Sequence, residues 1–207
     1  MSSANDPALP LALTCGDPAG IGPEIIARWL AAHAGEAGGV VAIGPAGWAE
    51  TLPCASRPVG PPDFAVTPGE PSLEGARVAL AAMEEAAAGC REGRYAAVVT
   101  GPVNKAWLAQ AGYRFPGQTE FFADHWGGVP VMAFAGGRLQ VTLATWHIPL
   151  AQVPQALTAG NLTRAVEAAE GLAVALGVRL PRIAVCGLNP HAGAGGILGR
   201  GARDNLD

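Results

Sequence analysis

The sequence predicts an α/β protein whose sheet combines parallel strands with one antiparallel hairpin. Short apolar runs alternate with longer segments of helical periodicity, which is the pattern of parallel strands joined by crossover helices. Turns rich in Gly and Pro follow the apolar runs. One pair of β-rich runs is joined by Gly136-Gly137, which is typical of a hairpin. We therefore expect a mixed sheet with an antiparallel portion.

The first half of the chain contains three predicted strands and two predicted helices. Pro23 suits the first turn of one helix, and Ser72 can cap the start of the other. Between them lies a proline-rich stretch that predicts loop with at most short strands. In chain order these segments are strand 11–15, helix 23–34, strand 40–43, loop 54–71, helix 72–89 and strand 96–99.

The second half is less regular. Its predicted hairpin joins residues 129–135 to residues 138–145, and a helix is expected over 162–176. His125 follows Phe121-Phe122 on a further helix, and residues 182–186 form the last predicted strand.

Composition excludes several classes of protein. The chain has 207 residues, 50% hydrophobic and 14% charged, which is too apolar for a disordered polymer. It has no apolar run of the ~18–20 residues needed for a membrane span, and its first residues do not resemble a signal peptide. A net charge of −4 without basic blocks argues against nucleic-acid and membrane partners. Four cysteines without a C-x-x-C motif predict free thiols and a cytoplasmic location.

Four loops follow predicted strands, and such loops form the sites of open α/β sheets. They cover residues 16–24, 100–105, 146–150 and 189–196. Two of the four histidines, His147 and His191, lie in these loops, a placement that suits a shared metal or substrate site. The alternative, which spacing alone does not exclude, is that each is a solvated loop histidine. The first loop reads G-x-x-x-G-x-G, so it lacks the dinucleotide fingerprint, yet its free amides could bind phosphate or carboxylate.

Lys105 is the only lysine beside twelve arginines. In a sequence with a strong arginine bias, arginine takes the place of lysine wherever only a positive surface charge is needed. A retained lysine therefore points to a place where a compact ammonium is required, although one lysine could also fall there by chance.

Five motifs occur in one order, and together they closely resemble the 4-hydroxythreonine-4-phosphate dehydrogenase family of vitamin B6 biosynthesis. The motifs are Gly16-Asp17-Pro18-Ala19-Gly20-Ile21-Gly22-Pro23-Glu24, Thr100-Gly101-Pro102-Val103-Asn104-Lys105, Gly117-Gln118-Thr119-Glu120-Phe121, His147-Ile148-Pro149-Leu150 and Gly187-Leu188-Asn189-Pro190-His191-Ala192-Gly193. The resemblance implies an α/β/α two-domain architecture similar to isocitrate and isopropylmalate dehydrogenases. The domains would cover residues 1–115 and 116–207, the second lying at the interface of a homodimer.

The resemblance also implies a reaction. Family members oxidise 4-phosphohydroxy-L-threonine with NAD or NADP, and the product loses CO2. His147 and His191 would be two of three histidine ligands to a divalent metal (Zn, Mg or Co). Gln118 and Thr119 would bind the phosphorylated substrate, and Lys105 is a catalytic candidate that would contact an anion.

Three departures from the family pattern suggest alternative interpretations of the function. Gln118 stands where the family usually has His, and glutamine cannot carry a proton. Ala194 stands where the family has Glu, and the chain ends at Asp207 where relatives continue, so we expect a C-terminal truncation. The alternatives are a non-catalytic member that binds a phosphorylated metabolite and a dehydrogenase with an altered phosphorylated hydroxy-acid substrate.

Overall fold

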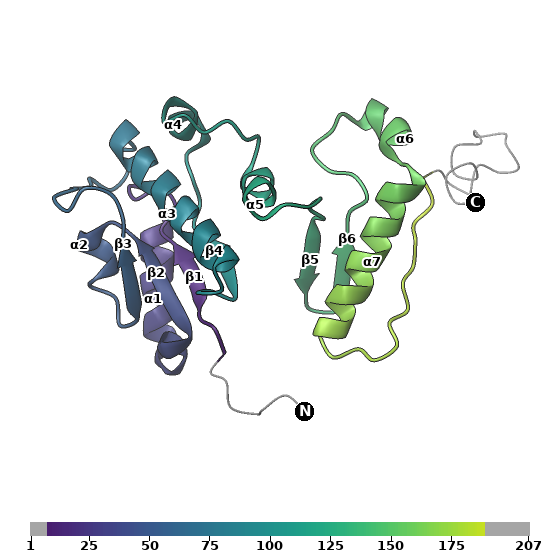
Figure 1. The fold of residues 1–207 in the computed structure, drawn as a ribbon, viewed down its shortest axis with the longest axis horizontal. Helices are drawn as coiled ribbons and strands as arrows, with labels where there is room; N and C mark the ends of the chain where they lie inside the picture. The colour runs from purple at the N-terminus through teal and green to yellow at the C-terminus, as the bar shows by residue number, and fades with distance from the viewer. Residues whose placement is uncertain (1–7, 189–207) are drawn as a thin grey trace, which may run out of the picture. The chain divides into compact units, whose positions relative to one another are not determined.

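The structure is a computed structural model that describes residues 8–188. The chain forms two compact units, which divide between Gly128 and Val129 and are described separately (Figure 1).

Unit 1 is built on a four-stranded sheet in which every neighbouring pair of strands is parallel. The strand order is β3-β2-β1-β4, so the first strand of the chain lies inside the sheet. Leu11 of β1 is in register with Val40 of β2 on one side and with Ala97 of β4 on the other. The strands are β1 (Leu11–Thr14), β2 (Val40–Gly44), β3 (Ala55–Pro58) and β4 (Ala97–Thr100). Three of them lie where the sequence predicts strands, and β3 falls in the proline-rich stretch.

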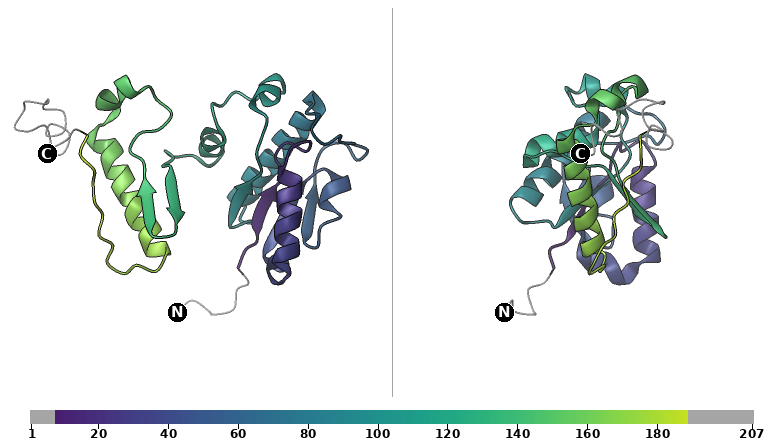
Figure 2. Two further views of the ribbon diagram at one scale, coloured as in Figure 1. Left: turned by 180° about the vertical axis from the view of Figure 1, so that it is seen from behind. Right: turned by 90° about the vertical axis from the view of Figure 1, so that its right-hand side faces the viewer.

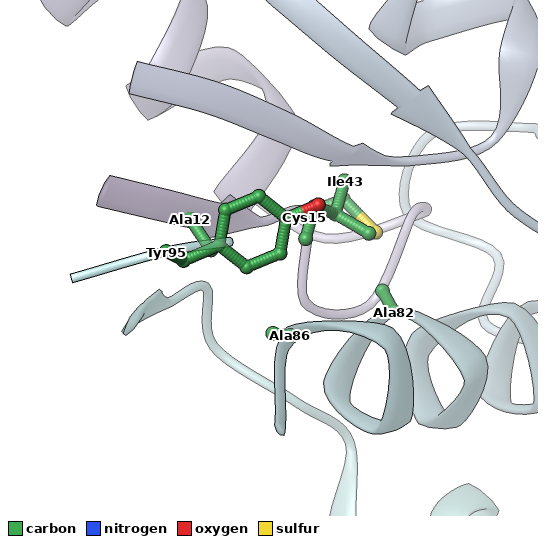
Figure 3. Packing of buried hydrophobic residues seen from close by; sticks show 6 residues of the cluster. All are labelled: Ala12, Cys15, Ile43, Ala82, Ala86 and Tyr95. Carbon is green, nitrogen blue, oxygen red and sulfur yellow. The ribbon is translucent and has the colours of Figure 1, made fainter. Parts of the chain in front are cut away.

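Helices cover both faces of this sheet (Figure 2). Alternate residues of β1 point to opposite faces, as expected for a strand buried on both sides. Leu13 packs with Leu30 of α1 (Gly22–Ala32). The short 3-10 helix η1 (Ala34–Gly39) follows α1 in the chain. Ala12 packs on the other face against Ala82 and Ala86 of α3 (Leu73–Arg91), together with Cys15, Ile43 and Tyr95 (Figure 3).

The predicted cap of the long helix is confirmed. The Ser72 hydroxyl oxygen accepts a hydrogen bond from the Gly75 amide at 3.1 Å. Glu74 in the first turn and Arg91 in the last turn have the charges that a helix dipole favours.

Three shorter helices complete unit 1: α2 (Ala46–Ala49), α4 (Lys105–Gln110) and α5 (Gln118–Trp126). Phe121 and Phe122 of α5 are buried with Met83 and Ala87 of α3. Because α5 belongs to this core, the compact units divide after Gly128, later in the chain than the domain boundary expected between residues 115 and 116.

Unit 2 contains the antiparallel hairpin of β5 (Ala133–Gly136) and β6 (Leu139–Thr142). Its turn is Gly137-Arg138, one residue later than predicted, with Gly137 at φ +52°. After η2 (Leu150–Gln152) and α6 (Val153–Ala156), α7 (Ala159–Ala175) packs against β6, and the Thr142 hydroxyl donates to the Ala165 carbonyl at 2.8 Å.

The α/β fold class is confirmed, with the expected parallel strands and antiparallel hairpin, which form a four-stranded and a two-stranded sheet among the described residues. One strand prediction is wrong. Residues 182–186 form no strand, since no neighbouring strand within 8–188 supplies the hydrogen bonds that a strand requires. Within the same part of the chain, no helix has the length and apolar character to cross a membrane.

Candidate functional site

The carboxyl ends of β1 and β4 are joined by direct backbone contacts, and this junction is the candidate site of unit 1. The Gly101 amide donates to the Thr14 carbonyl at 3.0 Å, and the Asp17 amide donates to the Pro102 carbonyl at 2.8 Å. Two of the predicted strand-end loops therefore form one structure, at the edge of the sheet where open α/β proteins place their sites.

Glycine at two positions makes this junction possible. Gly16 has φ +69°, and a Cβ added to it would lie 2.3 Å from the Pro102 carbonyl oxygen. A Cβ on Gly101 would lie 2.5 Å from the Cys15 carbonyl oxygen. The two loops are thus closer than any residue with a side chain would allow.

Three amides of the turn after β1 are already hydrogen-bonded within the protein, so they are not available to the anion expected there. The Ala19 amide donates to the Asp17 carboxylate at 3.0 Å, and the Gly20 amide donates to the Asp17 carbonyl at 2.9 Å. The Asp17 amide is bonded to Pro102, as described above. Asp17 is itself buried, so its carboxylate adds negative charge where an anion would have to approach.

Cys15 is a packing residue at the same junction. It is fully buried, and burial raises the pKa of its thiol to about 12. The thiol donates to the Gly16 carbonyl at 3.2 Å and remains protonated at neutral pH, so it is not a nucleophile.

Gln118, a predicted substrate-binding residue, reaches this junction from the first turn of α5. Its side-chain amide nitrogen donates to the Gly101 carbonyl in a long hydrogen bond of 3.5 Å. A carbonyl can only accept, so the amide oxygen of Gln118 faces away from Gly101. This oxygen is buried and has no partner among the described residues. An unsatisfied buried acceptor costs about 1–3 kcal/mol, which a hydrogen-bond donor on a bound ligand would offset.

The structure places the other predicted residues of unit 1 close along the chain to this junction. Thr119 follows Gln118 and is half-buried. Lys105 is the first residue of α4, just after the loop that contains Gly101, and the Asn104 side chain caps this helix by accepting from the Trp107 amide at 3.3 Å. The Lys105 ammonium is exposed and makes no ion pair within residues 8–188.

His147, a predicted metal ligand, lies in unit 2 in the loop after β6. It is exposed and has φ +54°, the one positive φ at a non-glycine residue in the described chain. Such a conformation costs energy, less for histidine than for most residues, and residues held in it cluster at functional sites. His191 lies outside the described residues. Residues 8–188 contain no group of three metal-ligating side chains, so they do not assemble a metal site by themselves.

Asp17 was not singled out by the sequence analysis. The signal for it was present, because Asp-Pro followed by Gly is typical of a turn in which the aspartate side chain accepts from a nearby backbone amide.

The parallel sheet and the glycine-dependent junction at its carboxyl edge define an α/β protein with its candidate site beyond the strand ends. Comparison with known proteins supports the fold and shows the family. The family model "Pyridoxal phosphate biosynthetic protein PdxA" matches residues 25–206. A 4-hydroxythreonine-4-phosphate dehydrogenase of Thioalkalivibrio sulfidiphilus is 41% identical over 92% of this chain. The "Putative D-threonate 4-phosphate dehydrogenase" of Bradyrhizobium diazoefficiens is 37% identical over 92% of this chain.

A solved structure shows the same fold. The crystal structure of 4-hydroxythreonine-4-phosphate dehydrogenase from Klebsiella pneumoniae matches with a TM-score of 0.78 and 31% identity, covering 93% of this chain and 67% of that one. The chain belongs to the PdxA family. It spans 65% of the length of the Thioalkalivibrio relative and 63% of the Bradyrhizobium one.

Proposed function

We propose that this chain acts as a 4-hydroxythreonine-4-phosphate dehydrogenase, a cytoplasmic homodimer that oxidises 4-phosphohydroxy-L-threonine with NAD or NADP and a divalent metal, with decarboxylation. Family membership supports the reaction class. The observation that carries the proposal is the Gln118 amide, which lies against Gly101 with a buried oxygen that has no partner among the described residues.

The residues of unit 1 have separate roles in this proposal. The Gln118 amide oxygen accepts a hydrogen bond from the substrate, and Thr119 binds the substrate beside it. Lys105 supplies positive charge for the phosphate, since its exposed ammonium is free of ion pairs within the described chain. Gln118 cannot carry a proton, so it orients the substrate and does not act as an acid or base.

His147 and His191 are the proposed metal ligands. The positive φ of His147 supports a functional role for this residue. His191 lies outside the described residues, which do not assemble a metal site by themselves.

A second candidate function is the oxidation of a different phosphorylated hydroxy acid. The Gln118 amide oxygen can accept from a hydroxyl as well as from an ammonium. D-Threonate 4-phosphate would present a hydroxyl in place of the amino group, and one relative is named for that substrate.

Turnover and binding assays with the purified chain test these proposals. Each phosphorylated compound is mixed with NAD or NADP and with Zn²⁺, Mg²⁺ or Co²⁺; reduced-cofactor absorbance reports turnover, and calorimetry reports binding. We expect reduced cofactor to form with 4-phosphohydroxy-L-threonine. Turnover of D-threonate 4-phosphate alone would support the second candidate. Binding without turnover would identify a non-catalytic family member. The absence of both binding and turnover would refute the proposal.

The variant Gln118→His separates a dehydrogenase from a binding protein. Histidine restores a group that can carry a proton, so it should raise turnover in a dehydrogenase and have no such effect in a binding protein. Gln110→His is the matched control, because Gln110 is an exposed glutamine of α4 whose amide donates only to the Ala106 carbonyl.

A further inference from the structure

Tyr113 is fixed in place by the end of α4. Gly112 follows this helix with φ +95°, and its amide donates to the Ala109 carbonyl at 3.2 Å. The Tyr113 amide donates to the Leu108 carbonyl at 3.0 Å, which completes a Schellman motif. Tyr113 also packs against the apolar cluster around buried Leu108, the contact that usually accompanies this motif.

The side chain of Tyr113 extends to the start of α5. Its hydroxyl donates to the Gly117 carbonyl at 2.8 Å. Gly117 is the residue that precedes the helix, and it has no side chain with which to cap it. The centroid of the Tyr113 ring lies 5.5 Å from that of Phe115 and 5.8 Å from that of Phe121. This aromatic packing holds the direction of the hydroxyl.

The surroundings keep this hydroxyl a donor. Burial, with a smaller contribution from the Glu120 carboxylate, raises the pKa of Tyr113 to about 12. Glu120 lies in the same helical turn, and one of its carboxylate oxygens would lie 2.9 Å from a Cβ on Gly117. A side chain at position 117 would therefore displace the Glu120 carboxylate.

We propose that Tyr113 is a positioning residue that ties the end of the helix carrying Lys105 to the turn that presents Gln118 and Thr119. Gly117 immediately precedes Gln118, so a fixed Gly117 carbonyl fixes the direction in which the Gln118 side chain leaves the helix. The link to substrate rests on the proposed function, whereas the link between the two helices does not. Tyr113 touches neither Gln118 nor substrate directly in this scheme; it acts through the backbone.

The test is amide hydrogen exchange in Tyr113→Phe, which removes the hydroxyl and keeps the ring. We expect exchange at the Phe121 amide, which donates to the same Gly117 carbonyl at 3.3 Å, to rise about fivefold, the effect of one lost hydrogen bond on local opening. Tyr95→Phe is the matched control, since Tyr95 is a buried tyrosine of the same unit whose hydroxyl bonds to Glu85 and Arg94 instead. It should leave exchange at the Phe121 amide unchanged. Unchanged exchange in Tyr113→Phe, or an equal rise in both variants, overturns the proposal.

A second variant approaches the same link from the backbone. Gly112→Ala keeps the hydroxyl but strains the φ +95° position that anchors Tyr113, and nothing lies within 4 Å of the added Cβ. Gly93→Ala, at φ +72° and also in open space, is its control. Exchange at the Phe121 amide should rise in the first variant and not in the second, and equal exchange in the two variants contradicts the proposal.

Substrate binding is measured separately. If the wild-type chain binds 4-phosphohydroxy-L-threonine, Tyr113→Phe should raise the dissociation constant several-fold while Tyr95→Phe does not. An unchanged constant would overturn the link to substrate. If the wild-type chain binds no phosphorylated hydroxy acid, the proposed function fails, and hydrogen exchange still decides whether Tyr113 positions the turn.

Discussion

Replacing Gly16 by alanine tests the junction between β1 and β4 directly. The added methyl group meets two problems, a backbone at φ +69° and a carbonyl oxygen of Pro102 at 2.3 Å. Both neighbouring atoms that it would contact most closely belong to the backbone of the opposite loop, so no side-chain rotation can relieve the clash. The two loops must separate, or the turn must change its conformation.

The expected loss of stability follows from these two terms. A left-handed conformation costs an L-residue about 1–2 kcal/mol, and forcing a methyl group into a filled space costs about 1–3 kcal/mol. Gly16→Ala should therefore lower the free energy of unfolding by about 2–5 kcal/mol. That is a large part of the ~5–15 kcal/mol typical of a domain.

Urea denaturation of Gly16→Ala beside Gly93→Ala isolates the contact term. Gly93 has φ +72°, and nothing lies within 4 Å of its added Cβ, so its variant carries the conformational cost alone. The smaller entropy of the unfolded chain with alanine is the same in both variants and cancels. Gly16→Ala should be the less stable by about 1–3 kcal/mol. Equal stabilities would refute the close approach of the two loops.

Three further predictions concern the core and the helix caps of unit 1. Ser72→Ala should lower the free energy of unfolding in urea by about 1 kcal/mol, whereas Ser56→Ala, on an exposed edge strand, should change it little. At pH 8 a thiol reagent should label exposed Cys186 rapidly and Cys15 only after unfolding. The pKa of the Cys15 thiol is about 12 in the native protein and near 9 in the unfolded chain, so its contribution to stability should be full below pH 9 and lost between pH 9 and 12. Cys15→Ala should remove this contribution. Met83→Ala should cost about 2–5 kcal/mol in thermal or urea unfolding, and Met83→Leu less than about 1.5 kcal/mol, since Met83 is fully buried.

Much of unit 1 could be predicted from local sequence. The strands around Leu13, Ala42 and Val98 lie within a residue or two of the expected positions, because apolar runs and turn residues are local signals. The long helix was recognisable by its periodicity and by Ser72. The helix α4 was missed because six residues hold too few turns to show a period.

The strand expected over residues 182–186 shows the limit of local signals. Ile183 and Val185 have high β propensity, but strand pairing also requires a neighbouring strand, which can come from any part of the fold. Propensity alone therefore placed a strand where the described chain forms no regular element and is exposed.

Sequence motifs supplied the candidate residues, whose roles stay predictions, but not the bonds that the structure shows around them. Motifs pointed to Lys105, Gln118 and His147, and resemblance to a family gave them roles. The bond from the Asp17 amide to the Pro102 carbonyl and the bond from the Tyr113 hydroxyl to the Gly117 carbonyl depend on the three-dimensional path of the loops, which no spacing in the sequence reveals.

The place of β1 inside the sheet has a consequence for the order of folding. β1 can pair with β2 after a short crossover, but its pairing with β4 must close a loop that contains most of the residues of unit 1. We expect β4 to dock late, after the nucleus formed by β1, α1 and β2. Since Gly16 and Gly101 meet only when β4 docks, the candidate site forms in the last steps of folding, and partly folded chains lack it.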